Sequence, residues 1–545
     1  MAGLCLAVTY LLAGCVASPA SEKSFDPPEQ TIGERLFLET RFAQYFAVNM
    51  SNVNAPLAVG DPVVAQVQNV YDASPMSGPF AGKSINCRSC HFVDEFQGVP
   101  NAGNRTYSDF TTRSPIPRAM NGFTNTPRNA MQMVGSLEKH AGPTFLHFDG
   151  EFTDPVDLVR TTLTGRNFGW APDQYQQAVV HIGQVIREDN GQGDLAAKYG
   201  SFSYAAIFLG TDSRIPLKYQ LPQQYRLDVT TASDEQILDN VAQLITQYMK
   251  SLLFQTDDQG RFNGSPYDIF LWINGLPRKP DAGETDQQYD QRLLQAVNAL
   301  TNPKFVDSRY GKFQFHQQPF TFGATELQGL KVFLNAANGA VDGSQHAGNC
   351  VACHRPPNFT DFQFHNTGAS QEEYDAANGA GTFMALSVPD LATRSQDYDA
   401  YLPASANHPN ASERFRHAAV AGSPQYADLG LWNVYENPDI PNPQANLMSI
   451  VCANAQNCAV DQGLPATIAQ FKTPTLRDLE DSAPYFHNGS KLKFTDVVLF
   501  YIQSSQLARQ GQLRNPPLEF QGMSISQDDV AALSAFLVSL TEDYH

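Results

Sequence analysis

The chain has 545 residues, of which 42% are hydrophobic and 17% are charged, and its formal net charge is -19. Since domains typically hold about 100–200 residues, this length predicts more than one, and the composition excludes a disordered or membrane-embedded chain. The acidic surplus argues against binding to nucleic acid or to an anionic membrane surface, because both need a surplus of Lys and Arg. A charged partner is expected to be basic.

The N-terminal residues predict export. The segment from Ala2 to Gly14 is apolar, too short to span a bilayer and followed by a polar run, as in the hydrophobic region of a signal peptide. Leu12-Ala13-Gly14-Cys15 is similar to a bacterial lipobox, in which the Cys is lipidated. We expect residues 1–15 to be a signal or lipoprotein segment and residues 16–30 a tether. This places the protein in the periplasm or cell envelope of a Gram-negative bacterium; a secretory signal without a lipid anchor is the alternative, since no Lys or Arg precedes the apolar run.

Helical periodicity dominates the rest of the chain. The segment from Thr31 to Phe37 predicts a helix that opens the first domain. Apolar residues with helical spacing recur in four further segments, 234–254, 286–300, 323–335 and 526–540. Strand-like alternation is scarce. The stretch from Pro356 to Thr473 is rich in Asn, Pro, Gly and Ala and predicts long ordered loops.

Two Cys-x-x-Cys-His motifs, Cys87 to His91 and Cys350 to His354, predict two covalently attached c-type haems. In this motif the thiols add to the porphyrin vinyl groups and the adjacent His binds the iron. A zinc site or a redox cysteine pair is the alternative, but neither explains a terminal His in both motifs of an exported chain. We expect the porphyrins to be held by Cys87, Cys90, Cys350 and Cys353, and the irons by His91 and His354.

One motif for each half predicts a mainly α fold of two cytochrome c-type haem domains with long loops. The first domain is expected to span residues 31–318, with insertions, and the second residues 319–545.

Several blocks of sequence around these motifs match one known family. They are Gly348 to Asp361, Phe364 to Gly368, Phe471 to Arg477 and Ala483 to Gly489 in the second half, with Asn125 to Pro127 and Phe148 to Gly150 in the first. Together they resemble the bacterial dihaem cytochrome c peroxidases and the related dihaem enzymes that mature methylamine dehydrogenase. The resemblance covers most of residues 31–545 and is densest after Gly323.

The resemblance implies a tyrosine ligand for the second haem. In the family's peroxidases a Met on the helix after the Pro-Tyr-x-His-x-Gly block ligates this haem. Alignment of that helix with Asp496 to Tyr501 places Tyr501 at the ligand position, as in the enzymes that mature methylamine dehydrogenase, and a phenolate would lower the potential relative to Met. Tyr501 as a packed aromatic, or His487 as the ligand, are the alternatives. His365 is expected to be structural or to lie near a propionate.

The first haem is expected to have an open or weakly filled sixth site. The family's peroxidases hold a removable His beyond the proximal one, but the matching position here is Tyr107, and no His occurs between His91 and His140. Such a site suits hydrogen peroxide or oxygen. A remote His140 or His147 that folds back onto the iron is the alternative.

The residues expected to act in catalysis differ from those of the family. Its Gln and Glu beyond the aromatic-Asp-Gly turn are not evident here. Arg166 would stabilise a developing hydroxide but cannot act as a base, and a salt bridge to a propionate or carboxylate is its alternative role. Glu151 is a second candidate for moving protons. Phe148 stands where the peroxidases have a Trp between the haems, and Phe is much harder to oxidise.

The resemblance also implies a calcium ion between the domains. Its ligands would be the side chain of Asn125 and the backbone oxygens of Lys472 and Pro474. An ordinary turn at these positions is the alternative.

Taken together, these features predict an exported dihaem oxidoreductase that reduces hydrogen peroxide at the first haem and relays electrons through the second. The donor would be a small periplasmic cytochrome c, a copper protein or an oxidisable substrate. One alternative is a dihaem oxidase or oxygenase acting on a protein or organic substrate. The other is a passive electron-transfer cytochrome with two six-coordinate haems.

Overall fold

The computed structural model describes residues 26–63, 84–91, 116, 125–313, 316, 318–339, 341–451, 459–480 and 482–543. These residues are mainly helical, which confirms the predicted fold class at this level. None of the described helices has both the length and the apolar composition needed to cross a membrane.

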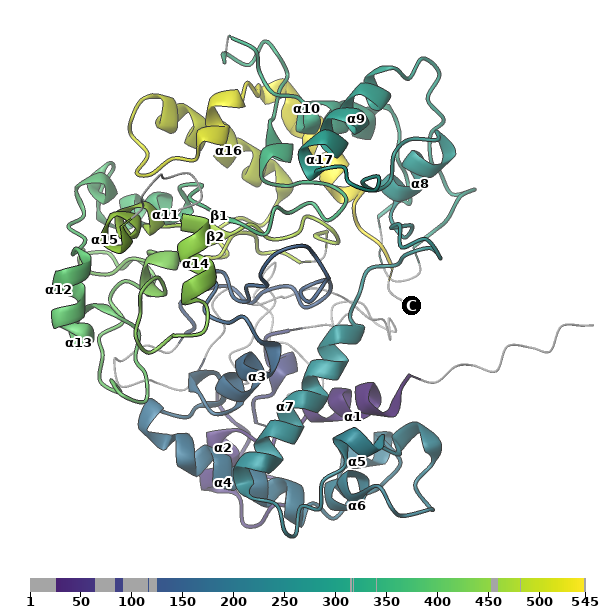
Figure 1. The fold of residues 1–545 in the computed structure, drawn as a ribbon, viewed down its shortest axis with the longest axis vertical. Coiled ribbons are helices and arrows are strands. Elements are labelled where there is room, and N and C mark those ends of the chain that lie inside the picture. The colour runs from purple at the N-terminus through teal and green to yellow at the C-terminus, as the bar shows by residue number, and fades with distance from the viewer. Residues whose placement is uncertain are drawn as a thin grey trace, which may run out of the picture.

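The helices fall into two groups along the chain (Figure 1). The first group is α1 (Pro28–Phe37), α2 (Gln44–Asn49), α3 (Pro155–Leu163), α4 (Tyr175–Glu188), α5 (Asp194–Lys198), α6 (Tyr204–Leu209) and α7 (Asp234–Ser251). The second is α8 (Pro266–Ile273), α9 (Asp286–Asn298), α10 (Ala324–Leu334), α11 (Ala369–Asn378), α12 (Leu391–Gln396), α13 (Tyr398–Tyr401), α14 (Gln444–Val451), α15 (Val460–Gly463), α16 (Phe494–Arg509) and α17 (Val530–Val538). Strands β1 (Phe364–His365) and β2 (Phe471–Lys472) form one antiparallel pair, with Phe364 opposite Lys472.

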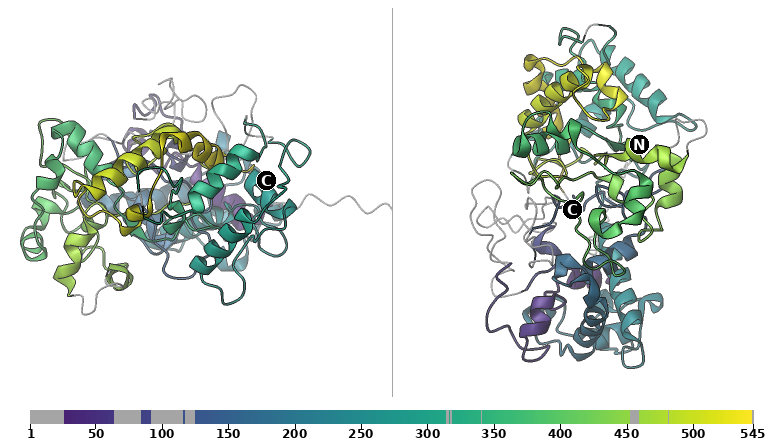
Figure 2. Two further views of the ribbon diagram at one scale, coloured as in Figure 1. Left: turned by 90° about the horizontal axis from the view of Figure 1, so that it is seen from above. Right: turned by 90° about the vertical axis from the view of Figure 1, so that its left-hand side faces the viewer.

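The two groups occupy opposite ends of the molecule. In Figure 1, α1 to α7 fill the lower end and α8, α9, α10, α16 and α17 the upper end, and the side view in Figure 2 shows the same division. Helices α11 to α15 cluster beside the β1–β2 pair, between the two ends. The segment that the sequence predicts as long loops therefore folds into short helices and turns that border both halves.

Local capping explains where the predicted long helices begin. Ser233 caps α7 and Thr285 caps α9, each in a capping box with a Gln three residues later. The four helical segments predicted from periodicity are all present, and α7, α9 and α10 match to within a few residues. The fourth is shorter, since a 3-10 turn at Gln527–Asp529 precedes α17.

Each half contains one pair of helices that cross in close contact at a glycine. A β-carbon at Gly33 of α1 would lie 2.1 Å from the carbonyl oxygen of Leu244 in α7, and one at Gly329 of α10 would lie 2.0 Å from that of Ala532 in α17. Only Gly permits backbones to approach this closely. In both halves the first helix of the pair precedes a Cys-x-x-Cys-His motif, so the halves share one plan.

The apolar core is divided into separate clusters. One holds buried residues between Ile32 and Phe262, and another begins at Tyr267 and extends to Leu540. The change at residues 262–267 comes earlier in the chain than the predicted boundary at residue 318, because α8 and α9 bury their apolar residues in the cluster of α10 and α17. A third cluster surrounds the fully buried Trp432 and includes Phe145 from the first half.

Candidate functional site

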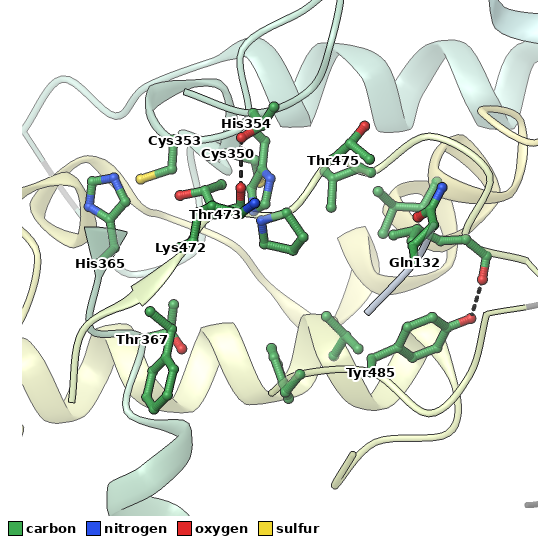
Figure 3. Close-up of a pocket in the computed structure, with 18 of the residues that line it drawn as sticks. Gln132, Cys350, Cys353, His354, His365, Thr367, Lys472, Thr473, Thr475 and Tyr485 are labelled. Carbon is green, nitrogen blue, oxygen red and sulfur yellow. Dashed lines mark hydrogen bonds between the residues drawn. The ribbon is translucent and has the colours of Figure 1, made fainter. Parts of the chain in front are cut away.

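The second Cys-x-x-Cys-His motif lines a mainly apolar cavity, which we call the His354 cavity (Figure 3). A 3-10 turn at Cys350–Ala352 precedes His354, whose backbone N–H donates to the Cys350 carbonyl at 2.8 Å. The Nδ1–H of His354 donates to the Phe359 carbonyl at 3.1 Å, which fixes the ring and leaves Nε2 for a metal. Burial lowers the pKa of His354, which favours the neutral imidazole that binds metals. These contacts fit the proximal ligand of a haem.

The first motif is built in the same way and lines a second cavity, the His91 cavity. The Nδ1–H of His91 donates to the Met131 carbonyl at 2.9 Å, again leaving Nε2 available. Burial raises the pKa of the Cys87 and Cys350 thiols to about 12. Thiols whose pKa is raised lack the accessible thiolate that a redox cysteine pair needs. Both motifs therefore fit covalent haem better than a redox disulfide.

Tyr501 lies on α16 and lines the His354 cavity, as the alignment predicts. Its hydroxyl makes no hydrogen bond to any described residue. Burial raises the pKa of this phenol, and the nearby thiols of Cys353 and Cys350 raise it further. The thioether of Met523 lines the same cavity and packs in the same small apolar cluster. Met523 is thus a further candidate sixth ligand beside Tyr501, and one that sequence reasoning missed.

His487 is held by aromatic and polar contacts. Its ring stacks on Phe471, with ring centroids 3.5 Å apart, and its Nε2 is hydrogen-bonded to Ser370 Oγ at 3.2 Å. The side chain is buried in these contacts at the edge of the His354 cavity. They favour the structural role over the ligand role.

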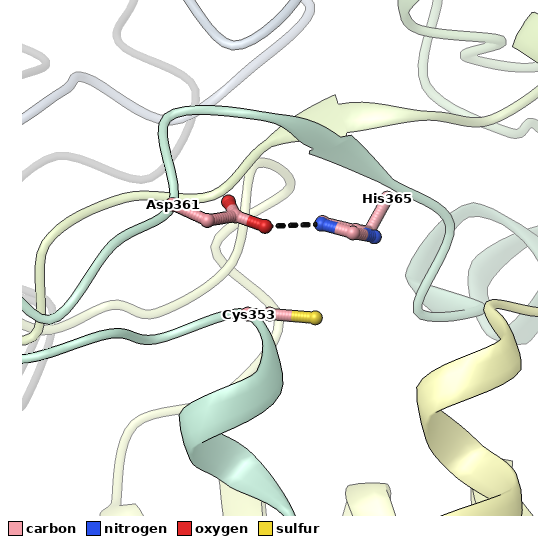
Figure 4. A group of neighbouring side chains, drawn as sticks. All are labelled: Cys353, Asp361 and His365. Atoms are coloured by element: carbon pink, nitrogen blue, oxygen red, sulfur yellow. Dashed lines mark hydrogen bonds and ion pairs between the residues drawn. The ribbon is translucent and has the colours of Figure 1, made fainter. Parts of the chain in front are cut away.

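His365 lies beside Cys353 and pairs with Asp361 (Figure 4). Its Nε2 is 2.7 Å from Asp361 Oδ2, and the ligand atoms of all three residues lie within 4.8 Å of one another. Although burial opposes the charged form, Asp361 and Cys353 raise the pKa of His365 to about 11. The ion pair with Asp361 supports the structural role expected for His365, and the neighbouring Cys353 would bond a vinyl group of the porphyrin.

The two histidines considered as remote ligands of the first haem, His140 and His147, line different cavities. His140 lines the His354 cavity and stacks on Phe362, with centroids 3.6 Å apart, so it does not fold back toward His91. His147 lines the His91 cavity, where its Nδ1 is hydrogen-bonded to Glu151 at 3.2 Å. Tyr107, at the position of the removable histidine, lies outside the described residues.

Arg166 lines the His91 cavity and forms an ion pair there with Glu413. The side chain of Glu413 is only 4% exposed. It comes from a loop of the second half, residues 404–413, that closes one side of this cavity. Sequence reasoning missed Glu413, because 247 residues separate it from Arg166. Arg166 therefore forms the salt bridge to a carboxylate that was its alternative role. The carboxylate, Glu413, lines the His91 cavity as well.

Glu151 also lines the His91 cavity but is already committed to a cation. Its Oε2 lies 2.5 Å from Arg416. Although burial opposes ionisation, Arg416 and then His147 hold the pKa of Glu151 well below its usual range. A carboxylate that stays ionised at neutral pH is poorly suited to carry a proton. Glu413 also pairs with an arginine, but it lacks the second, histidine partner that Glu151 has, so we take it as the better candidate of the two acids.

The two cavities share one wall. Phe148 and the segment 129–131 line both of them, and Met131 in this segment holds His91 through its carbonyl. The turn that carries Phe148 is tied to the second half by Arg128, which pairs with Asp149 at 2.5 Å and with Asp428 at 2.6 Å. Phe148 therefore lies between the cavities, as predicted from its alignment.

The three residues predicted to bind calcium are in different surroundings. Asn125 is exposed, whereas Lys472 and Pro474 line the His354 cavity. The Lys472 ammonium donates to the Phe145 carbonyl at 2.7 Å, and burial lowers its pKa to about 8. The calcium site stays a prediction.

No protein-family model matches the chain. Curated relatives do: it is 27% identical over 198 residues to the cytochrome-c peroxidase IdrP2 of Denitromonas iodatirespirans, and 24% identical over 198 residues to that of Pseudomonas sp. (strain SCT). Over this stretch the chain is similar to proteins named cytochrome-c peroxidase. This confirms the resemblance inferred from the motifs. The matched stretch is 36% of this chain and 36% of each relative, so the chain spans about a third of the length of the curated relatives that it matches.

Two solved structures are similar at a low level. One is a MauG-like protein associated with microbial copper homeostasis, with a TM-score of 0.41 and 14% identity, covering 98% of this chain and 96% of that chain. The other is the diheme peroxidase BthA from Burkholderia thailandensis E264, with a TM-score of 0.42 and 15% identity, covering 95% and 87%. Scores this low carry no argument about this chain.

Proposed function

We propose that this chain is an exported dihaem oxidoreductase of the cytochrome-c peroxidase type. It reduces hydrogen peroxide in the His91 cavity and takes electrons through the His354 cavity. The observation that carries the proposal is the difference between two similarly built cavities. A charged pair, Arg166 and Glu413, lines the His91 cavity, whereas the His354 cavity is mainly apolar and offers Tyr501 or Met523 as an iron ligand.

Each motif holds one haem in this proposal. Cys87, Cys90 and His91 hold the first, and Cys350, Cys353 and His354 hold the second. A c-type haem supplies a redox-active iron whose sixth position decides between storing an electron and binding a small molecule. The carbonyls of Met131 and Phe359 fix the two imidazoles, and Nε2 of each would bind the iron.

Arg166 and Glu413 supply the proton chemistry. Reduction of hydrogen peroxide consumes two electrons and two protons and yields two waters. The Glu413 carboxylate takes a proton from one peroxide oxygen and returns it to the other as the O–O bond breaks. Arg166, a permanent cation, stabilises the negative charge that develops on the leaving oxygen as the O–O bond breaks. The loop that carries Glu413 also excludes bulk water from this side of the cavity, which strengthens both interactions.

The second motif would hold the haem that receives electrons, and the shared wall would separate it from the first haem. The wall consists of Phe148 and the segment 129–131, and Met131 is hydrogen-bonded to His91. Since Phe is hard to oxidise, electrons would cross this wall by tunnelling, without a side-chain intermediate. A small basic cytochrome c or a copper protein suits the acidic surface of this chain as the donor.

A peroxide titration followed by stopped-flow absorbance tests the proposal. Stoichiometric peroxide should change the spectrum of at least one haem, and a reduced donor should restore it. An electron paramagnetic resonance spectrum of the ferric protein should contain a high-spin and a low-spin signal. Two low-spin signals and no response to peroxide or cyanide would instead identify a passive electron-transfer cytochrome.

Export, the anchor and the ion are further parts of the proposal that rest on sequence. We place the protein in the periplasm or cell envelope, with Cys15 as the attachment point of a lipid; Cys15 lies outside the described residues. A calcium ion bound by Asn125, Lys472 and Pro474 would join the two halves. Removal of calcium by a chelator should then lower the melting temperature.

A further inference from the structure

Tyr175 connects the His91 cavity with the protein surface. It is the first residue of α4, it lines the cavity, and its ring packs against the apolar core of the first half. Its hydroxyl reaches a group of polar side chains on α3 and α7, formed by Arg160, Glu235 and Asp239. These side chains are 29%, 43% and 42% exposed, respectively. One half-buried phenol thus borders both the cavity and solvent.

The phenol of Tyr175 has a base to receive its proton. Its O–H donates to Glu235 Oε2 at 3.0 Å, and its oxygen accepts from Arg160 Nη2 at 2.8 Å. Arg160 in turn pairs with Asp239 at 2.5 Å, which fixes the guanidinium. A phenol that loses an electron becomes a strong acid, so a carboxylate in hydrogen-bond contact allows the electron and the proton to leave together.

Trp170, in the same cavity, lacks this arrangement. Its Nε1–H donates to the backbone carbonyl of Phe42 at 3.2 Å, and the residue is 3% exposed. A carbonyl cannot hold the proton of an oxidised indole, and no solvent-borne molecule reaches so buried a ring. Burial raises the pKa of Tyr175, although Arg160 opposes this shift, so this phenol is protonated at neutral pH and keeps a proton to transfer.

We propose that Tyr175 is a second oxidation site, at which oxidising equivalents formed in the His91 cavity are passed to a small phenol or aromatic amine at the surface. This inference rests on the proposed peroxide chemistry. In each step Tyr175 gives one electron to the oxidised centre and its proton to Glu235, which leaves a neutral tyrosyl radical. The reductant then returns an electron to Tyr175, Glu235 returns the proton, and the reductant loses its own proton to water. Two such cycles use one hydrogen peroxide and yield two waters and two one-electron-oxidised reductants.

The surroundings of Tyr175 select the class of reductant. The ring of Tyr175 is half-buried, which suits a small molecule. Two carboxylates, Glu235 and Asp239, outnumber the single cation of Arg160, so a neutral or cationic aromatic is favoured over an anionic one.

Freeze-quench electron paramagnetic resonance after addition of peroxide to the haem-loaded protein tests the inference. The wild type should show a tyrosyl radical whose hyperfine structure narrows when ring-deuterated tyrosine is incorporated. Tyr175→Phe should lose that signal, and Glu235→Gln should lower its yield. Tyr225→Phe is the matched control and should keep it, since Tyr225 is half-buried against the same apolar core but does not line the cavity.

Oxidation of guaiacol provides a second measurement. Tyr175→Phe should lose most of the wild-type guaiacol oxidation and keep the oxidation of a reduced basic cytochrome c. A radical signal that persists in Tyr175→Phe, or equal loss of both activities, overturns the inference. The haem absorbance of the same samples separates two kinds of failure. If peroxide changes the absorbance without a tyrosyl radical, Tyr175 alone is wrongly assigned; if it changes nothing, the proposed function fails and this inference fails with it.

Discussion

Arg166 and Glu413 form an ion pair in the His91 cavity across 247 residues of sequence. One residue follows α3 and the other belongs to a loop of the second half. The cavity of the first motif is therefore completed by the second half, and neither half alone would contain the pair.

Glu413→Gln should slow the reaction with peroxide by about 100- to 10,000-fold, the range expected when a positioned proton carrier is removed. Glu413→Asp should keep part of the rate, since it retains a carboxylate. Stopped-flow absorbance with stoichiometric peroxide measures both. Glu372→Gln is the control, because Glu372 pairs with Lys491 away from this cavity, at 2.7 Å. Equal rates for Glu413→Gln and wild type would show that Glu413 serves only to hold Arg166.

The ligand of the second haem can be identified by a pair of substitutions in the His354 cavity. If Tyr501 is the ligand, Tyr501→Phe should shift the low-spin electron paramagnetic resonance signal and Met523→Leu should leave it unchanged. A phenolate also favours ferric iron, so Tyr501→Phe should raise the reduction potential of this haem. The opposite pattern, a shift in Met523→Leu alone, would assign the thioether and contradict the alignment that selected Tyr501.

Features encoded by neighbouring residues could be predicted from sequence. The haem motifs need only five residues each, and α7 and α9 need only their apolar spacing and a capping residue. The position of Phe148 between the cavities followed from a short aromatic-Asp-Gly turn.

Features that depend on packing across the chain could not be predicted. Glu413 lies in a stretch of irregular apolar spacing, because its neighbours are turns and helices of one or two turns. The same irregularity hid the core around Trp432, whose members come from many short segments. The placement of α8 and α9 with the second half was hidden as well, since periodicity reports an apolar face but not the partner that covers it.

Asp290 should make the stability of the second half depend on pH. It is buried on α9, and burial raises its pKa from 3.8 to about 7, although Arg355 opposes this shift. The folded protein therefore binds a proton that the unfolded chain releases above pH 4, and the resulting stabilisation is lost as the pH rises through 7. Asp290→Asn keeps the size of the side chain and cannot ionise. From pH 4 to pH 8 the melting temperature of wild type should fall more than that of the variant; parallel curves would show that Asp290 does not titrate in this range.

The two glycine crossings should tolerate an added methyl group poorly. Gly329→Ala brings a β-carbon against the Ala532 carbonyl, and Gly33→Ala does the same at Leu244. The helices must separate, and overpacking of this kind costs about 1–3 kcal/mol. For a half of this size, that loss should lower the melting temperature by roughly 2–12 °C.

Gly193→Ala is the control, since a β-carbon there meets no atom within 4 Å and the φ of Gly193 is -70°. Differential scanning calorimetry of the haem-loaded protein should show Gly33→Ala lowering the transition of the first half and Gly329→Ala that of the second. A single transition lowered equally by both would mean that the shared wall and the Arg166–Glu413 pair couple the halves into one folding unit.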